Sequence, residues 1–254
     1  MKPMNEANQN EIQSAVPILF EDEHLVAVAK PSGMFVHRSE ADRSATEFVL
    51  QNVRDQLGSF VYPVHRLDRP TSGVLMLAKT SEAAALFGKM FAERLIKKIY
   101  LALVRGHTDD SGMLNRPLVP SKGRGKPDTN PQTVPQEAET AYRTLERFEV
   151  PFASSQHAST RCALIEARPK TGRYHQIRRH MAGISHPIIG DADHGDTKLN
   201  RQFQQQAGVT RLMLAAVRVE FIHPVGKNLI SIECPPADSF AIVVDRLRLA
   251  SFGV

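Results

Sequence analysis

The sequence predicts a single α+β domain, and three observations point to it. The chain has 254 residues and is 42% hydrophobic, which is enough for a packed core. Strand-length apolar runs and helix-period apolar stripes both occur along it. Neither an internal repeat nor a clear linker divides it. We therefore expect the domain to occupy residues 16–254, after a polar, aperiodic and disordered tail at residues 1–15.

Charge and cysteine content narrow the class of protein. Lys and Arg number 32 against 27 Asp and Glu, so the net charge is +5. Cys162 and Cys234 are too few for a disulfide framework and lack the spacing of a zinc site. No apolar run approaches the ~20 residues that span a bilayer, and the N-terminus lacks a secretion signal. These features predict a cytoplasmic protein without a membrane partner.

The N-terminal part predicts a β-hairpin and a helix. The apolar runs 18–20 and 25–29 flank an acidic turn, as in a hairpin. Lys30–Gly33, read as KPSG, is expected to form a turn and nothing more. Helical spacing of apolar residues over 46–57 predicts a helix that ends at Gly58.

The apolar run Val74–Ala78 is the central predicted element, because it suits a strand buried on both faces. The mostly polar segment 65–72 precedes it and is expected to form a loop directly before the N-terminal end of this strand. Pro70 restricts the residue before it, and Gly73 permits backbone angles that other residues avoid. A rigid turn of this kind can hold Asp68 in one orientation.

Asp68 is the candidate reactive group of this loop. Arg66 and Arg69 lie beside it in the sequence, and a nearby cation lowers the pKa of a carboxyl group and keeps it ionised. An ionised carboxylate can act as a nucleophile or as a base. The alternative is an ordinary turn aspartate that forms a salt bridge within its own loop.

The remaining elements follow from the same patterns. A helix capped by Thr80 or Ser81 is expected to bury a stripe made of Ala84, Phe87, Phe91 and Leu95. Residues 109–137 are rich in Pro and Gly and predict a flexible insertion. Strands are predicted at 99–104, 142–148, 161–167, 212–221 and 228–233, and a C-terminal helix at 238–249.

Basic residues concentrate between Arg161 and Met181, with six cations against one acid, Glu166. Such a segment favours an anionic polymer as partner, although a solvated basic face explains it equally well. A helix predicted to begin at Tyr174 places Arg178 on its inward, apolar side. Arg178 then needs a buried carboxylate partner, for which Asp68 is the candidate, unless the side chain extends outward to solvent.

The segment 186–196, read as HPIIGDADHGD, resembles a metal cluster in composition. Its histidines and aspartates have no recognised ligand spacing, and turn-forming aspartates are the commoner explanation for such residues. A metal-dependent phosphoesterase using this cluster is therefore one alternative function.

Three motifs follow one another along the chain: HRLDRPTSG at 65–73, KIY at 98–100 and GRYHQIRRH at 172–180. They resemble the motifs of the RluA-type pseudouridine synthases, and KPSG and HPIIGDADHG match further signatures of that family. VHRS at 36–39, VRDQLG at 53–58, SHPIIGD and RLML at 211–214 resemble the branch that acts on the uridine at tRNA position 65.

The resemblance implies a mixed, mostly antiparallel sheet with flanking helices and a central catalytic cleft. It also implies that uridine is isomerised to pseudouridine: the N1–C1′ bond breaks, uracil turns, and a C5–C1′ bond forms. No cofactor and no metal are implied, and the expected partner is tRNA, bound by a monomer.

Site residues carry over position by position. Asp68 corresponds to the catalytic aspartate, which acts as nucleophile on the sugar or as base at C2′. Tyr100 matches the tyrosine that stacks on the uracil, and Arg178 the arginine that pairs with the aspartate. Ile177 matches an apolar contact near the base.

Further substrate-binding residues are expected on both sides of the reactive loop. Arg66 matches an arginine that fills the gap left by an extruded nucleotide, because chemistry on a base in folded RNA requires flipping. Arg173 and His175, in the GRYHQIRRH motif, complete the set. One departure is Ala215, where relatives usually have His, and this residue concerns local packing. Ribosomal RNA as substrate, or a non-catalytic RNA-binding protein on the same scaffold, are the alternatives.

Overall fold

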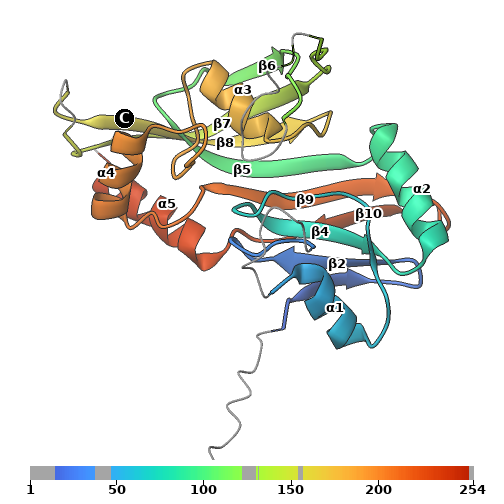
Figure 1. The fold of residues 1–254 in the computed structure, drawn as a ribbon. Helices are drawn as coiled ribbons and strands as arrows, with labels where there is room; N and C mark the ends of the chain where they lie inside the picture. The colour runs from blue at the N-terminus through green and yellow to red at the C-terminus, as the bar shows by residue number, and fades with distance from the viewer. Residues whose placement is uncertain (1–14, 38–46, 122–129, 131, 154–156, 252–254) are drawn as a thin grey trace, which may run out of the picture.

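The computed structural model describes residues 15–37, 47–121, 130, 132–153 and 157–251. One long, curved β-sheet runs through the molecule, with helices set around it (Figure 1). In chain order the elements are β1 (Ile18–Glu21), β2 (Leu25–Lys30), α1 (Val49–Leu57), β3 (Tyr62–Pro63), β4 (Ser72–Ala78), α2 (Ser81–Ala92), β5 (Lys97–Arg105), β6 (Ser111–Asn115), β7 (Glu139–Val150), β8 (Thr160–Pro169), α3 (Gln176–Gly183), α4 (Thr197–Ala207), β9 (Leu214–Ile222), β10 (Leu229–Glu233) and α5 (Asp238–Ala250).

The strand order of the sheet is β1-β2-β4-β9-β5-β8-β7-β6, with β10 paired to β9 and β3 to β4. Among the described strands, β4 and β9 form the one parallel pair, at Ser72↔Ala215 and Gly73↔Ala216. All other named pairs are antiparallel. The mixed, mostly antiparallel sheet of an α+β fold is therefore confirmed, and strands distant in sequence meet at its centre.

Several sequence predictions are confirmed in detail. β1 and β2 form the expected hairpin, and β4 is buried along its whole length. α1 ends at Gly58, which has the left-handed φ of 62° that terminates helices. Thr80 caps α2 by accepting a hydrogen bond from the amide of Ala83. These features depend on local patterns, which is why the sequence shows them.

Helix stripes were predicted less well. In α2 the buried residues are Ala83, Phe87 and Met90, whereas Leu95 lies beyond the helix and is 55% exposed. The α3 region also differs, because the helix begins at Gln176, so Tyr174 is outside it. α1 begins at Val49, and residue 46 is outside the described part of the chain.

Two regions carry structure that the sequence did not predict. The expected insertion 109–137 contains β6, which pairs with β7 and forms the edge of the sheet; residues 122–129 and 131 within it lie outside the described residues. α4 was not predicted at all, although Asp196 caps it by accepting from the amides of Lys198 and Leu199. The predicted tail lies outside the described residues apart from Ala15.

Ala215 occupies a packed position. It is 1% exposed and belongs to the largest apolar cluster, on the strand that pairs with both β4 and β5. A larger side chain at this point would need room in the apolar cluster on that face of the sheet, so the alanine is a packing feature. In the described part of the chain, no helix is both long and apolar enough to cross a membrane.

Candidate active site

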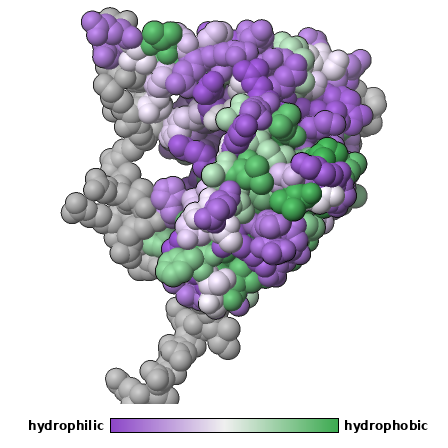
Figure 2. Space-filling view, turned by 90° about the vertical axis from the view of Figure 1, so that its right-hand side faces the viewer, coloured by the Kyte–Doolittle hydropathy of each residue, from purple (hydrophilic) through white to green (hydrophobic). Residues whose placement is uncertain are grey.

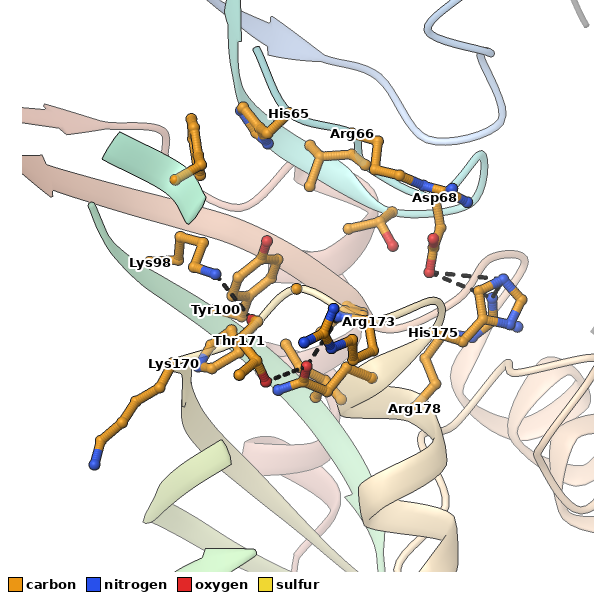
Figure 3. A pocket seen from close by; sticks show the side chains of 18 of the residues that line it. His65, Arg66, Asp68, Lys98, Tyr100, Lys170, Thr171, Arg173, His175 and Arg178 are labelled. Carbon is orange, nitrogen blue, oxygen red and sulfur yellow. Dashed lines mark hydrogen bonds and ion pairs between the residues drawn. The ribbon is translucent and has the colours of Figure 1, made fainter. Parts of the chain in front are cut away.

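A cavity of about 390 Å³ opens between the loop before β4, the strand β5 and the start of α3. Its volume lies within the range of small-molecule sites. All seven residues that the sequence nominated line it: Arg66, Asp68, Tyr100, Arg173, His175, Ile177 and Arg178. Figure 3 labels all of them except Ile177. Segments from three distant parts of the sequence therefore meet at one cavity.

The KPSG segment holds the loop that carries Asp68. The Lys30 ammonium, 1% exposed, donates to the carbonyls of Pro31, Arg69 and Thr71 at 2.8–2.9 Å. Ser32 Oγ donates to the Pro70 carbonyl at 2.7 Å. Three carbonyl acceptors require all three hydrogens of an ammonium group. The segment was predicted to be a turn and nothing more, but it clamps the reactive loop from the side.

The start of β4 anchors the other end of the loop. Gly73 has φ 112°, and a Cβ added there would overlap the carbonyl oxygen of Ala216 in β9. Gly73 therefore allows both the turn and the close approach of the parallel strand. His65 Nε2 accepts from the amide of Met76 at 3.0 Å, which ties the beginning of the motif to the same strand.

Asp68 extends from this loop toward α3 (Figure 3). Its Oδ2 lies 3.6 Å from Arg178 Nη1 and 3.8 Å from His175 Nε2. Burial raises the pKa of Asp68, and the charges of Arg178 and Arg66 offset this only in part. The expectation that Arg66 and Arg69 lower this pKa is therefore wrong in its net direction, because removal from water outweighs the cations.

Arg178 is 2% exposed, as its inward position predicted, but its closest carboxylate is not Asp68. Nε and Nη2 donate to the two oxygens of Asp191 at 2.7 and 2.6 Å. Nη2 also donates to Asp193 at 2.6 Å. Asp68 stands further away, at ion-pair distance. The predicted Arg178–Asp68 pair thus exists, yet Asp191 forms the direct, bidentate contact.

The segment 186–196 is a support for Arg178. Asp191 Oδ1 also accepts from the amides of Asp193 and His194, which is the geometry of a turn aspartate. Burial favours the neutral form of Asp191, but its hydrogen bonds with Arg178 outweigh this and lower its pKa. Among the described residues, no group of three or more His, Cys, Asp or Glu side chains is arranged to hold a metal ion.

Tyr100 comes from β5, where it pairs with Ala167 on one side and Ala216 on the other. Its ring lies in the cavity across from Asp68 (Figure 3). Burial, and then the negative charge of Asp68, raise the pKa of Tyr100 well above its ordinary value. The hydroxyl is therefore a neutral group, and Ile177 and Leu214 supply apolar surface beside it.

Several cations line the cavity. The guanidinium of Arg66 lies 5.3 Å from the ring centre of Tyr174, and Arg173 Nε donates to the Glu137 carbonyl at 2.9 Å. Lys98 donates to the Thr171 carbonyl at 2.9 Å, and burial lowers its pKa to about 8. On the face shown in Figure 2, hydrophilic side chains cover the upper part, while apolar ones gather in the middle.

Sequence reasoning missed three contributors to this site. Lys98 stands in the KIY motif but was given no role, and Lys30 stands in KPSG, which was taken as a plain turn. Asp191 was interpreted as a turn former or, alternatively, as part of a metal cluster, and not as the partner of Arg178. The sequence indicated the role of Asp191 only indirectly. A buried arginine requires a carboxylate partner, and three aspartates lie shortly after the helix that carries Arg178.

Two solved structures share this architecture. Human RNA pseudouridylate synthase domain containing 4 matches with a TM-score of 0.70 and 25% identity, over 91% of this chain and 93% of that chain. Human RNA pseudouridylate synthase domain containing 1 matches with a TM-score of 0.69 and 21% identity over the whole of both chains. The fold is therefore that of a pseudouridine synthase.

Sequence comparison is more specific. The family described as RNA pseudouridylate synthase matches residues 24–183. The tRNA pseudouridine synthase C of Vibrio cholerae is 48% identical over 82% of this chain and 85% of its own length. That of Pasteurella multocida is 45% identical over 85% of this chain and 89% of its own length. The chain belongs to the RluA-type RNA pseudouridylate synthase family and is a pseudouridine synthase.

Proposed function

We propose that this enzyme isomerises a uridine of tRNA, at position 65, to pseudouridine. The observation that carries the proposal is the cavity that brings Asp68, Tyr100 and Arg178 together. The tRNA substrate is supported by the names of the relatives above. Position 65 rests on the branch motifs, such as VHRS and VRDQLG, that the chain carries. We also propose that it acts in the cytoplasm, as a tRNA substrate would require, and that it acts as a monomer.

Asp68 performs the central step. When the N1–C1′ bond breaks, its electron pair leaves with the uracil and C1′ becomes electron-deficient. The Asp68 carboxylate either adds to C1′ or removes the C2′ proton, which it later returns. After uracil turns, C5 bonds to C1′, the C5 hydrogen leaves as a proton, and N1 gains a proton, so the exchange is redox-neutral.

The other residues bind and orient. Tyr100 presents a neutral aromatic face for the extruded uracil, with Ile177 as apolar contact; aromatic faces stack on bases. Arg178 supplies positive charge that offsets in part the effect of burial on the pKa of Asp68. Arg66 and Arg173 lie at the mouth of the cavity, where the flipped nucleotide enters and phosphates pass.

The proposal is tested by release of tritium from tRNA transcripts labelled at C5 of uridine, because only bond formation at C5 expels that hydrogen. The wild type and Asp245→Asn, a control on the exposed side of α5, should release tritium equally. Asp68→Asn should release none. When position 65 of the transcript is changed to cytidine, the wild-type enzyme should release one equivalent of tritium less per tRNA.

Other outcomes would contradict parts of the proposal. Unchanged release from the cytidine transcript would move the site to another uridine. Release from ribosomal RNA but not tRNA would overturn the tRNA substrate. Binding of tRNA without release from either RNA would favour the non-catalytic alternative.

A further inference from the structure

His175 lies immediately before α3 and aims a buried ring at the reactive pair. Its backbone is left-handed, with φ 50° and ψ 33°, a conformation that few non-glycine residues adopt. Its side chain is 6% exposed and stands 3.8 Å from Asp68 Oδ2. Sequence reasoning placed it among the substrate-binding residues, but its contacts point inward to protein groups.

The hydrogen bonds of His175 define its tautomer. Its Nε2 lies 2.8 Å from Arg178 Nη1, and a guanidinium only donates. Nε2 is therefore the acceptor, and the ring proton sits on Nδ1. That Nδ1 lies 2.9 Å from His194 Nε2, which accepts it. A directional chain thus runs from Arg178 through His175 to His194.

The ring is also held in place by packing. Tyr174 stacks on it, with ring centres 3.7 Å apart and an interplanar angle of 19°. His194 meets it edge-on at 5.1 Å. Burial, and then the charge of Arg178, lower the pKa of His175 to about 3, so the ring is neutral near pH 7 and Nε2 keeps its lone pair.

This arrangement divides the guanidinium of Arg178 between two tasks. Nε and Nη2 bind Asp191 and Asp193. Nη1 is the nitrogen that faces Asp68. One of its two hydrogens is donated to His175, and the nitrogen stays 3.6 Å from the Asp68 oxygen. That distance gives an ion pair without the short hydrogen bond that would occupy the carboxylate.

We propose that His175 is a positioning residue that accepts a hydrogen bond from Arg178 Nη1 and so keeps the oxygen of Asp68 charged but free to react. This inference rests on the proposed role of Asp68. It revises His175 from a substrate contact to a support for the reactive pair, with His194 fixing its tautomer.

The other groups that face Asp68 are unchanged in the variants below, so they serve as a constant background. They are Lys30 from β2, Arg66 from its own loop, Tyr100 from β5 and Asp191 from the segment after α3.

The first test follows the Asp68 carboxyl in the free enzyme by carbon-13 NMR, with Asp68→Asn to assign its signal. In His175→Asn the amide is too short to reach Nη1, while asparagine tolerates the left-handed backbone. Nη1 should then close onto Asp68, and the carboxyl should titrate at lower pH than in wild type. His175→Gln, whose amide oxygen reaches the place of Nε2, should restore the wild-type titration.

Two more variants separate positioning from general damage. His194→Ala leaves the backbone of the site untouched but removes the acceptor that fixes the tautomer of His175. It should therefore lower the titration pH of Asp68, by less than His175→Asn does. His180→Gln alters a buried histidine of the same helix that bonds Thr140 and Arg116 instead. His180→Gln should lower the free energy of unfolding without changing the pH at which the Asp68 carboxyl titrates. An unchanged titration in both His175→Asn and His194→Ala would overturn the proposal.

Kinetics provide the second readout. His175→Asn should lower kcat about tenfold to a hundredfold with little change in KM, as expected for a misplaced reactive group, and His175→Gln should recover most of it. A raised KM with unchanged kcat would overturn the proposal and return His175 to substrate binding. If the wild type fails to act on tRNA, the proposed substrate fails, whereas the titration result still decides the role of His175.

Discussion

Arg178 is bound by Asp191 at 2.6 and 2.7 Å and stands 3.6 Å from Asp68. The arginine is therefore neutralised chiefly by Asp191, which is a different carboxylate from the proposed reactive one. The contact between Arg178 and Asp68 is longer than a hydrogen bond. The Asp68 carboxylate is therefore less engaged by the arginine than it would be in a direct salt bridge.

The Asp191 contact predicts a large effect on stability. Asp191→Asn leaves a buried guanidinium without its bidentate partner, so the free energy of unfolding should fall by about 3–5 kcal/mol in urea titrations. Asp193 binds the same arginine, but its side chain is 44% exposed. Asp193→Asn should therefore lower the free energy of unfolding by at most about 1 kcal/mol. Equal losses for Asp191→Asn and Asp193→Asn would contradict this account.

The raised pKa of Asp68 predicts how stability depends on pH. The folded state binds the Asp68 proton more tightly than the unfolded chain, so this group stabilises the fold at low pH and loses that contribution as pH rises through its folded pKa. Asp68→Asn should therefore be more stable than wild type near pH 7. The gain should shrink as pH falls toward 4, near the ordinary pKa of an aspartate.

Thermal unfolding at several pH values measures this effect. Asp245→Asn, on the surface of α5, is the control and should stay within about 0.5 kcal/mol of wild type. A stability loss in Asp68→Asn near pH 7 would show that Arg178 holds the charge more favourably than burial penalises it.

The same group predicts the acid side of the activity profile. Since the reaction needs the ionised carboxylate, kcat/KM should fall with decreasing pH through the pKa of Asp68, above the usual value for aspartate. Tritium release measured across pH checks this, with binding followed separately to exclude loss of RNA affinity. An acid limb at or below the usual aspartate value would contradict the prediction.

Two glycines give a matched test of the backbone around the reactive loop. Gly73→Ala adds a Cβ that overlaps the Ala216 carbonyl at a positive φ, so it should cost about 2 kcal/mol or more. Gly88 lies inside α2 with open space around it. Gly88→Ala should stabilise the protein by about 0.5–1 kcal/mol, and a lower free energy of unfolding in both variants would contradict this account.

The cations at the cavity mouth predict the salt dependence of RNA binding. Arg66→Ala should weaken tRNA binding and reduce the slope of log K against log salt by about one. Arg248 lies on α5, where it pairs with Glu146 and Asp245. Arg248→Ala should leave the slope unchanged. Filter-binding titrations at several salt concentrations measure both, and equal effects would argue against a specific role for Arg66.

The sequence by itself determined the local elements and the motifs. The strand predicted at Val74–Ala78, which the structure extends to Ser72–Ala78, and the stop at Gly58 follow from short-range patterns, which need no knowledge of distant residues. The placement of Asp68, Tyr100 and Arg178 in one cavity was expected from the resemblance, and the structure brings them together. α4 was missed because its polar sequence has a narrow apolar stripe, with Phe203 and Ala207 as its buried residues.

Only the tertiary structure decided which carboxylate binds Arg178 and in which direction the pKa of Asp68 moves. Asp68 and Asp191 are both aspartates of turn-like segments, and sequence spacing does not rank their distances from a guanidinium in space. The pKa depends on how much water the fold removes, and desolvation is a property of the assembled cavity. The left-handed backbone of His175, which aims its ring at Arg178, likewise exists only once the loop and α3 are packed together.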